Sequence, residues 1–439
     1  MPSPEHRAVG STLRRQPPAR SRSSRGVHPG QRATLARVNS PVRILLGLLV
    51  GSLVGAFVAP HAPWLVEYVA KPVGALFLRL LLVLVMPLAA AALILGIAEM
   101  RPGSLGGVAR RAGAWTLGLT TIAVLIGVTL THVVGPGRGV DRAALPAGVA
   151  PAAYSGNPVD AFIAMFPDNV IAAASRGELL GVLFAAVLFG LALRSLEGPA
   201  VTTVRDGIQG FFEVCARGVQ MVMVLAPVGV GGLICVWVAR TGLGGLLPLA
   251  SFVGVVVGSI LLQAIVVYGL ALRSAGWSPT RFYRAAEPAL AMAFSTASSA
   301  ATLPTTLRVA EENLHLPTER ARFVLTVGAS ANQNGTALFE GVAVLFLAQL
   351  YAVDLSFLQQ TYVVGIAILA GVGTAGVPGA SLPVIVAVAG SVGVPAEAVG
   401  VLVGVDRLLD MCRTTLNVAG DLVIAAVLSP PPPVVIRPR

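Results

Sequence analysis

The last apolar segment of the chain contains the sequence Asp406-Arg-Leu-Leu-Asp-Met-Cys-Arg-Thr-Thr-Leu-Asn-Val-Ala-Gly-Asp421. At about 100° per residue in a helix, its polar side chains point within an arc of about 120°. We call this set the polar stripe; it comprises Asp406, Arg407, Asp410, Arg413, Thr414, Asn417 and Asp421. A charge at the centre of a bilayer costs about 2.5–3.5 kcal/mol. In a membrane-spanning helix the stripe must therefore face a cavity or other polar groups.

Composition places the chain in a membrane. Its 439 residues are 55% hydrophobic and only 12% charged, which is too little charge for the surface of a soluble protein of this length. Apolar runs of about 20 residues recur, long enough to cross a bilayer as helices. The first six predicted spans cover residues 42–60, 68–99, 112–134, 158–195, 205–238 and 247–272. The sequence thus predicts an all-α membrane protein.

Most arginines outside the spans lie in the amino-terminal tail and in alternate loops. Residues 1–40 hold eight of them against Glu5 alone and are rich in Pro, Ser and Gly, so we expect a disordered tail. Such a tail could bind nucleic acid, but arginines also follow the second, fourth and sixth spans, as the positive-inside rule requires. We therefore predict an inner-membrane protein with both termini cytoplasmic and no nucleic-acid partner. Arg138, Arg142 and Arg240 are exceptions, on the opposite side.

The last 150 residues differ from the rest because small, polar or Pro/Gly runs interrupt the apolar segments. Two such segments, 284–308 and 360–393, each turn at a Ser/Gly-rich tip and precede a span with a polar interior. Unpaired backbone at membrane depth is tolerated only inside protein or beside a water-filled cavity. Interrupted segments in corresponding positions point to a transporter's binding site. We expect a repeated unit of re-entrant hairpin plus helix.

The polar stripe has two interpretations. It could be a structural network of salt bridges, which Arg407, three residues before Asp410, fits best. Alternatively, Arg413 binds a substrate carboxylate in a bidentate manner and Asp410 binds its ammonium group. Asp421 can then hold a hard cation together with backbone carbonyls. We favour the second interpretation because the stripe accompanies two hairpins and a broken helix.

Four motifs carry a specific resemblance. Residues 299–304 (Ser-Ala-Ala-Thr-Leu-Pro), 332–336 (Asn-Gln-Asn-Gly-Thr), 373–379 (Gly-Thr-Ala-Gly-Val-Pro-Gly) and 410–421 resemble, in the same order, those of the dicarboxylate/amino acid:cation symporters, the glutamate transporter family. The similarity covers about residues 42–428.

The resemblance implies a fold of eight spans and two re-entrant hairpins, assembled as a homotrimer. Residues 1–40 and 429–439 would be cytoplasmic tails. Residues 41–280 would form spans one to six, with spans one, two, four and five in a scaffold and spans three and six in a mobile transport domain. Residues 281–428 would be the core of that domain, which moves like an elevator. The implied activity is cation-coupled symport of an acidic amino acid, aspartate or glutamate, and the protein is not expected to be an enzyme.

The resemblance also implies site residues. Those for substrate are Ser298, Ser299, Thr336, Val377, Gly379, Asp410, Arg413, Thr414 and Asn417. Those for sodium, the expected coupling ion, are Gly328, Ser330, Asn332, Gly371, Val372, Thr374, Asn417 and Asp421. Members for neutral amino acids lack the arginine, and dicarboxylate members lack the aspartate. Both are kept here, so an acidic amino acid is expected rather than either alternative.

Departures from the family pattern concern coupling. Asn334 stands where the family has an aspartate of a deep sodium site, and Leu117 stands where it has a tyrosine, while Thr120 and Thr121 remain. That site is expected to be weakened or lost. Glu340 occupies the position of a proton-carrying glutamate in animal glutamate transporters, and a buried carboxyl favours its neutral form. It could carry a proton or be purely structural.

Two other classes compete with a transporter. An intramembrane enzyme could use Asp406 and Asp410 as a dyad, or Ser298 or Ser299 as a nucleophile, but no histidine or lysine base lies in the polar segments. A channel is the second. Substrate-coupled ion flux would distinguish all three.

Overall fold

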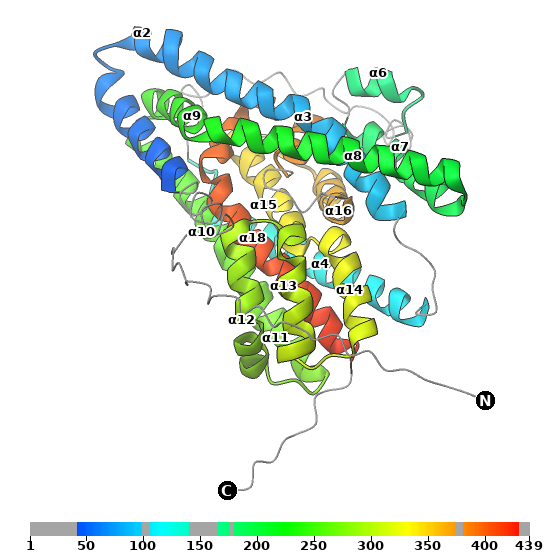
Figure 1. The fold of residues 1–439 in the computed structure, drawn as a ribbon. Helices are drawn as coiled ribbons and strands as arrows, with labels where there is room; N and C mark the ends of the chain where they lie inside the picture. Colours follow the sequence, from blue (N-terminus) through cyan, green and yellow to red (C-terminus); the bar gives the residue numbers. More distant parts are fainter. Residues whose placement is uncertain (1–41, 99–105, 140–165, 176–178, 374–380, 430–439) are drawn as a thin grey trace, which may run out of the picture.

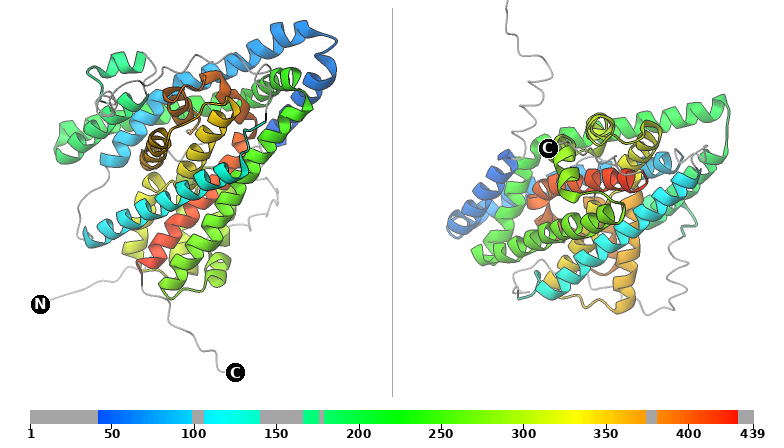
Figure 2. Two further views of the ribbon diagram at one scale, coloured as in Figure 1. Left: turned by 180° about the vertical axis from the view of Figure 1, so that it is seen from behind. Right: turned by 90° about the horizontal axis from the view of Figure 1, so that it is seen from below.

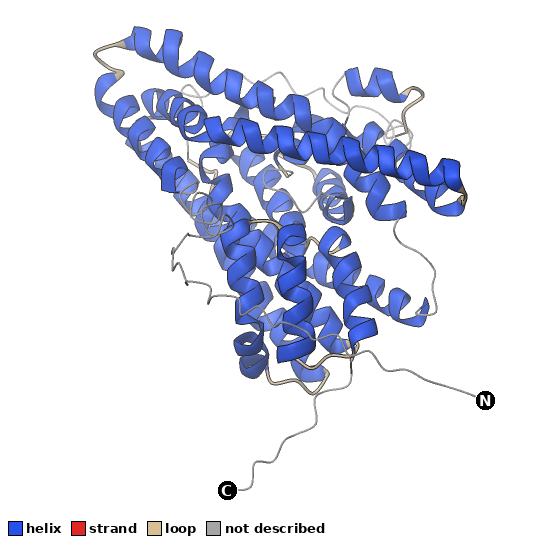
Figure 3. Cartoon of the chain, in the orientation of Figure 1, coloured by secondary structure: helices blue, strands red, loops and turns tan. Residues whose placement is uncertain are grey.

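The fold is built from helices. The computed structural model describes residues 42–98, 106–139, 166–175, 179–373 and 381–429, and all regular structure within these ranges is helical (Figure 3). This confirms the predicted all-α class. The predicted tail 1–40 lies outside the described residues, and so does the tail predicted over 429–439 except for its first residue.

The long apolar helices coincide with predicted spans. Four stretches of the described chain are long and apolar enough to cross a membrane: Pro63–Ala98, Gly107–Val134, Pro199–Thr241 and Leu243–Ser274. The first predicted span corresponds to the shorter helix Val42–Val58. The span predicted over 158–195 is described in part, as α6 (Val170–Ser175) and α7 (Leu179–Ser195).

One group of helices packs around α3 (Lys71–Ala98). It contacts α7, α8 (Pro199–Val222) and α9 (Ala226–Thr241). In Figure 1 the blue α3 and the green α8 cross the upper part of the molecule together. Proline at the first position of α8 has a fixed φ that suits a helix start. The helix Val42–Val58, which ends in the π-helical η1 (Val54–Val58), packs on α9 and belongs to this group.

Small residues make the contact between Val42–Val58 and α9. Gly47, Gly51 and Gly55 recur every four residues, and a Cβ on each would collide with the backbone of Pro227, Gly231 and Cys235, in that order. The two backbones therefore touch directly along what we call the glycine seam. Small residues at this spacing allow close helix packing in membranes, where dispersion rather than water exclusion drives association.

The second group surrounds α18 (Gly400–Val427). This helix contacts α10 (Leu246–Leu262), α12 (Pro279–Thr296), α14 (Thr318–Ala331) and α15 (Asn334–Leu350). The views in Figures 1 and 2 both place the red α18 among the yellow and green helices. On the far side of α15 lies α4 (Gly106–Val134), and Phe252, Phe339 and Phe346 pack between α10 and α15. Through the π-helical η6 (Gln263–Val267), α10 continues into α11 (Tyr268–Ser274).

The interruptions predicted from sequence are present where the structure describes them. α12 and α13 (Ser299–Arg308) form a hairpin whose turn places Ala297 in the left-handed region, with φ 48°. Ser298 caps α13 by accepting a hydrogen bond from the Ala301 amide at 3.2 Å. Residues 332 and 333 separate α14 from α15. The second hairpin joins α16 (Phe357–Gly373) to α17 (Leu382–Ser391), but its tip, residues 374–380, lies outside the described residues.

Candidate functional site

The polar stripe faces the protein interior. Six of its seven side chains are buried and Arg407 is partly exposed. Helices α12, α14 and α15 surround α18, so the charges and amides find partners in protein instead of lipid. This is the arrangement that intramembrane ionisable residues require.

Arg413 lies at the centre of the charged part. Its guanidinium is 1% exposed and donates hydrogen bonds of 3.0 Å to Asp406 Oδ1 and 3.0 Å to Asp410 Oδ1. It donates another, of 2.8 Å, to Ser381 Oγ at the start of α17. Its Cζ also lies 3.9 Å from the ring centroid of Phe339, a cation–π contact. The second hairpin, α15 and α18 therefore all contact the guanidinium of Arg413.

Asp410 has two cationic neighbours. Besides its bond to Arg413, its second carboxylate oxygen is 3.7 Å from Arg407 NH1. Arg407 thus makes the longer ion pair expected of a structural residue. Asp406, a member of the polar stripe, is an ion-pair partner of Arg413.

Asn417 joins α18 to the broken helix. Its Oδ1 accepts from the Gly335 amide at 2.7 Å, and its Nδ2 donates to Gln333 Oε1 at 2.5 Å and to Thr336 Oγ1 at 3.2 Å. The structure thus brings together Thr336 and Asn417, two of the predicted substrate residues. Thr414, one turn before Asn417, is also buried.

Asp421 forms a separate oxygen-rich cluster. Asn332 Nδ2 donates to Asp421 Oδ1 at 2.8 Å, and the Asn332 amide donates to the Gly328 carbonyl at 2.8 Å. Gly328 packs so tightly on the Asp421 carboxylate that a Cβ there would collide with it. The Asn332 Oδ1 is buried without a hydrogen-bond partner among the described residues. A buried carboxylate beside an unsatisfied amide oxygen is a donor set that fits a hard cation.

The predicted deep site is filled by neutral groups. Thr120 donates to Asn334 Oδ1 at 2.5 Å, and Asn334 Nδ2 donates to the hydroxyl of Tyr268 at 2.8 Å. That hydroxyl donates to the Leu416 carbonyl on α18 at 3.3 Å. The Thr121 hydroxyl donates to the Leu117 carbonyl in its own helix at 2.8 Å. Leu117 is 56% exposed and points out of the interior.

Glu340 lies next to the arginine centre. It is buried in α15, directly after the Phe339 that stacks on Arg413, and it lies within electrostatic range of that guanidinium. Glu340 thus belongs to the charged surroundings of the Arg413 guanidinium.

The remaining predicted residues are only partly described. Ser299 is buried and its hydroxyl has no hydrogen-bond partner among the described residues, whereas Ser298 caps α13. Gly371 packs against Ala337 of α15. Ser330 lies in the last turn of α14 and Val372 in the last turn of α16. The predicted residues Thr374, Val377 and Gly379 lie outside the described residues.

Sequence reasoning missed three contributors. Ser381 and Phe339 contact Arg413, and Tyr268 completes the network of Asn334. The sequence did indicate a hydrogen-bonding role for Tyr268, because a lone phenol in an apolar span needs a partner when it is buried.

Comparisons with known proteins agree with this geometry. The sequence profile of the sodium:dicarboxylate symporter family matches residues 41–430. The chain is 36% identical to the "Proton/glutamate-aspartate symporter" of Escherichia coli (strain K12), over 88% of this chain and 91% of that protein. It is 33% identical to the "Proton/sodium-glutamate symport protein" of Bacillus subtilis (strain 168), with the same coverage. It is 30% identical to the "C4-dicarboxylate transport protein" of Burkholderia ambifaria (strain MC40-6), again over 88% and 91%.

The matched region contains the polar stripe, the broken helix and both hairpins. The family profile matches nearly the whole chain, and the relatives named above are at least 30% identical to it. The protein therefore belongs to the sodium:dicarboxylate symporter family.

Proposed function

We propose that this protein is a secondary active transporter that carries an acidic amino acid, aspartate or glutamate, across the membrane by symport with a cation. Two relatives named for glutamate or glutamate-aspartate symport support the substrate class. The named relatives include proton- and sodium-coupled proteins.

One observation carries the substrate assignment: a single buried guanidinium, Arg413, hydrogen-bonds to two carboxylates, Asp406 and Asp410. An acidic amino acid offers the complementary pair of groups. Its side-chain carboxylate can replace an aspartate on Arg413 in the bidentate geometry that arginine favours. Asp410, released from Arg413, can then accept hydrogen bonds from the substrate ammonium.

The backbone carboxylate of the substrate would bind near Thr336, Thr414 and Asn417. Asn417 is held by the Gly335 amide and Gln333, so its orientation is fixed before substrate arrives. Ser299 of the first hairpin and the tip of the second, with Val377 and Gly379, would close over the substrate.

A C4-dicarboxylate is the second candidate substrate, since one group of relatives is named for it. Such a molecule has two carboxylates and no ammonium group. It would bring its second negative charge near Asp406 and Asp410, which disfavours its binding. We therefore rank it below an acidic amino acid.

Sodium would bind at Asp421, Asn332, Gly328 and Asn417. A second sodium would bind to carbonyls at Ser330, Gly371, Val372 and Thr374. In the deep region, Asn334 makes its hydrogen bonds with Thr120 and Tyr268, so we expect no third sodium there. Glu340 is the candidate proton carrier in its place, and fewer sodium ions per substrate are expected than in members that keep the aspartate.

The movement we propose is an elevator. The helices around α18 would form a mobile transport domain, comprising spans three and six with residues 281–428, and those around α3 would form the scaffold of a homotrimer. Both termini would lie in the cytoplasm, with the protein in the inner membrane.

Uptake of labelled aspartate and glutamate into proteoliposomes, with sodium and proton gradients imposed separately, tests this function. We expect concentrative uptake of both amino acids that depends on at least one gradient. Labelled succinate is the comparison substrate. Uptake of succinate alone would replace our first candidate by the second, and ion flux without coupled uptake would indicate a channel.

A further inference from the structure

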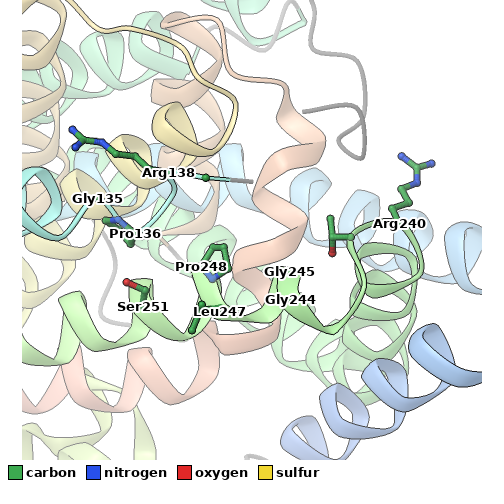
Figure 4. Close-up of a pocket in the computed structure, with 11 residues that line it drawn as sticks. Gly135, Pro136, Arg138, Arg240, Gly244, Gly245, Leu247, Pro248 and Ser251 are labelled. Carbon is green, nitrogen blue, oxygen red and sulfur yellow. The ribbon is translucent and has the colours of Figure 1, made fainter. Parts of the chain in front are cut away.

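A pocket lies away from the polar stripe. It has a volume of about 480 Å³ and forms where three segments meet: the turn after α4, the end of α9 and the start of α10. Figure 4 shows Arg138 and Arg240 on opposite sides of this pocket, with their guanidinium groups pointing away from each other. None of the groups assigned above to substrate, sodium or proton lines it.

The lining is cationic. Arg138 and Arg240 are its charged members, and no acidic residue is among the eleven that line it. Both arginines are exposed, and neither makes an ion pair with any residue that the structure describes. No ion pair with a described residue therefore fixes either guanidinium, although the aliphatic part of the Arg138 side chain packs against Gly135.

These arginines also break the charge sorting of the sequence. In the proposed topology, the loops after spans three and five face away from the cytoplasm, where the positive-inside rule disfavours arginine. Arg138 and Arg240 lie more than 100 residues apart in sequence, yet the fold places both at one pocket. Because the fold brings these two exceptions to the positive-inside rule to one pocket, we expect both arginines to bind the same anionic ligand.

The pocket walls are fixed by specific contacts. Gly135 and Gly242 have φ of 61° and 69°, a region that favours glycine, and they set the turns after α4 and α9. Gln349 of α15 accepts from the Gly137 amide at 3.2 Å and donates to the Thr131 carbonyl at 3.1 Å. Trp237 donates to the Gly245 carbonyl at 3.0 Å. These hydrogen bonds and turns therefore fix the shape of the pocket walls.

Apolar side chains adjoin the arginines. Val133 and Val134 end α4 beside the first, and Leu243 and Leu247 follow the second; all four are exposed, Leu247 by 73%. In a bilayer these side chains contact acyl chains, which places the adjoining guanidinium groups at the level of the lipid headgroups. A phospholipid provides both a phosphate for the guanidinium groups and acyl chains for the apolar side chains.

We propose that this pocket binds the phosphate group of an anionic phospholipid from the leaflet opposite the arginine-rich amino-terminal tail, through Arg138 and Arg240. The inference rests on the proposed topology but not on the proposed substrate. The bound lipid would connect the end of α9 with the ends of α4 and α10, which belong to different helix groups.

The test measures binding to the full-length protein without transport. The melting temperature is recorded in neutral detergent micelles with added phosphatidylglycerol, phosphatidylcholine or inorganic phosphate at matched ionic strength, because a ligand of the folded state raises it. The Arg138→Gln/Arg240→Gln double variant is compared with Arg194→Gln/Arg273→Gln. The control arginines are also exposed and lie in the last turns of α7 and α11, as Arg240 does in α9.

We expect phosphatidylglycerol, but neither of the other additives, to raise the melting temperature of the wild type and of the control variant. In the pocket variant the half-saturating lipid concentration should rise at least about tenfold, the effect of losing charge-assisted hydrogen bonds. An equal response to phosphatidylcholine would overturn the proposal, and so would a full response to inorganic phosphate. If the pocket variant melts lower without lipid yet keeps the lipid response, the arginines only stabilise helix ends, and the proposal is wrong.

Discussion

Arg413 donates a hydrogen bond of 3.0 Å to Asp410, which lies three residues earlier on the same helix. An i,i+3 pair is held by the geometry of one helix and not by the packing of separate elements. The cation and anion that we assign to the two ends of the substrate therefore keep their relative position when α18 moves.

Replacing Arg413 should remove acidic substrates. In Arg413→Ala, loss of a buried charge partner costs about 3–5 kcal/mol, a reduction of several hundredfold or more in affinity. We expect aspartate uptake to be abolished and uptake of a small neutral amino acid such as alanine to appear. Arg407→Ala is the control, because Arg407 makes only the 3.7 Å ion pair. Unchanged aspartate uptake in Arg413→Ala would disprove the assignment.

Replacing Asp410 should discriminate between ligands. Asp410→Asn removes the anion for the ammonium group, while Asp406 remains bonded to Arg413. We expect aspartate binding to weaken at least about tenfold more than succinate binding, since a hydrogen bond to a charged group contributes about 1.5–3 kcal/mol. Competition against labelled substrate in proteoliposomes measures both. Equal weakening of the two ligands would mean that Asp410 does not bind the ammonium group.

Asp421 should determine the affinity for sodium. Asp421→Asn keeps the oxygen that accepts from Asn332 but removes the negative charge. The sodium concentration for half-maximal uptake should rise by about tenfold or more, because the charge of the ligands sets cation affinity. Asp206→Asn, at an exposed acid of α8, is the matched control. A sodium dependence that is the same in both variants would place the ion elsewhere.

Glu340 should carry the proton. An inward proton gradient alone is expected to accelerate wild-type uptake, because a buried carboxyl near Arg413 can bind and release a proton as its surroundings change. Glu340→Gln should remove the acceleration and leave aspartate binding within about twofold of the wild type. Glu319→Gln, at an exposed acid in the first turn of α14, should respond like the wild type. If Glu340→Gln still responds to the proton gradient, the carboxyl is structural.

The glycine seam should be sensitive to a single methyl group. In Gly51→Ala the new Cβ would collide with the Gly231 carbonyl, so the two helices must separate; we expect a loss of about 1–3 kcal/mol. Gly254→Ala is the control, since no atom lies within 4 Å of a Cβ there, and alanine is the better helix former. Melting temperatures in detergent compare them. Similar values for the two variants would show that the seam tolerates separation.

What could be predicted from the sequence was local. Helical periodicity put the seven stripe residues on one side of α18, and six of them are buried there. The Asn332-Gln-Asn run predicted the break between α14 and α15, because a polar run that interrupts an apolar segment indicates irregular backbone, which at membrane depth must lie inside protein. Spans could be predicted because apolar length alone decides them.

What could not be predicted depends on distant partners. Ser381 reaches Arg413 from another helix, and Tyr268 reaches Asn334 across 66 residues of sequence. Periodicity assigns a face to each residue but does not say which other element covers that face. The hydrogen bond of Thr121 is a local one, since threonine hydroxyls in helices often donate to the carbonyl four residues earlier.

The glycine seam also has a consequence for biosynthesis. Its two halves, Gly47–Gly55 and Pro227–Cys235, are separated by more than 170 residues, so the first helix enters the bilayer long before its partner is synthesised. Its remaining surface carries exposed Leu45, Leu46, Leu49 and Val50, and a helix with such a surface is stable in lipid alone. The two helices that form the glycine seam are therefore synthesised at different times. The contact can form only once Pro227–Cys235 has been synthesised, and truncated chains that end before Pro227 would leave the glycine face open to other helices.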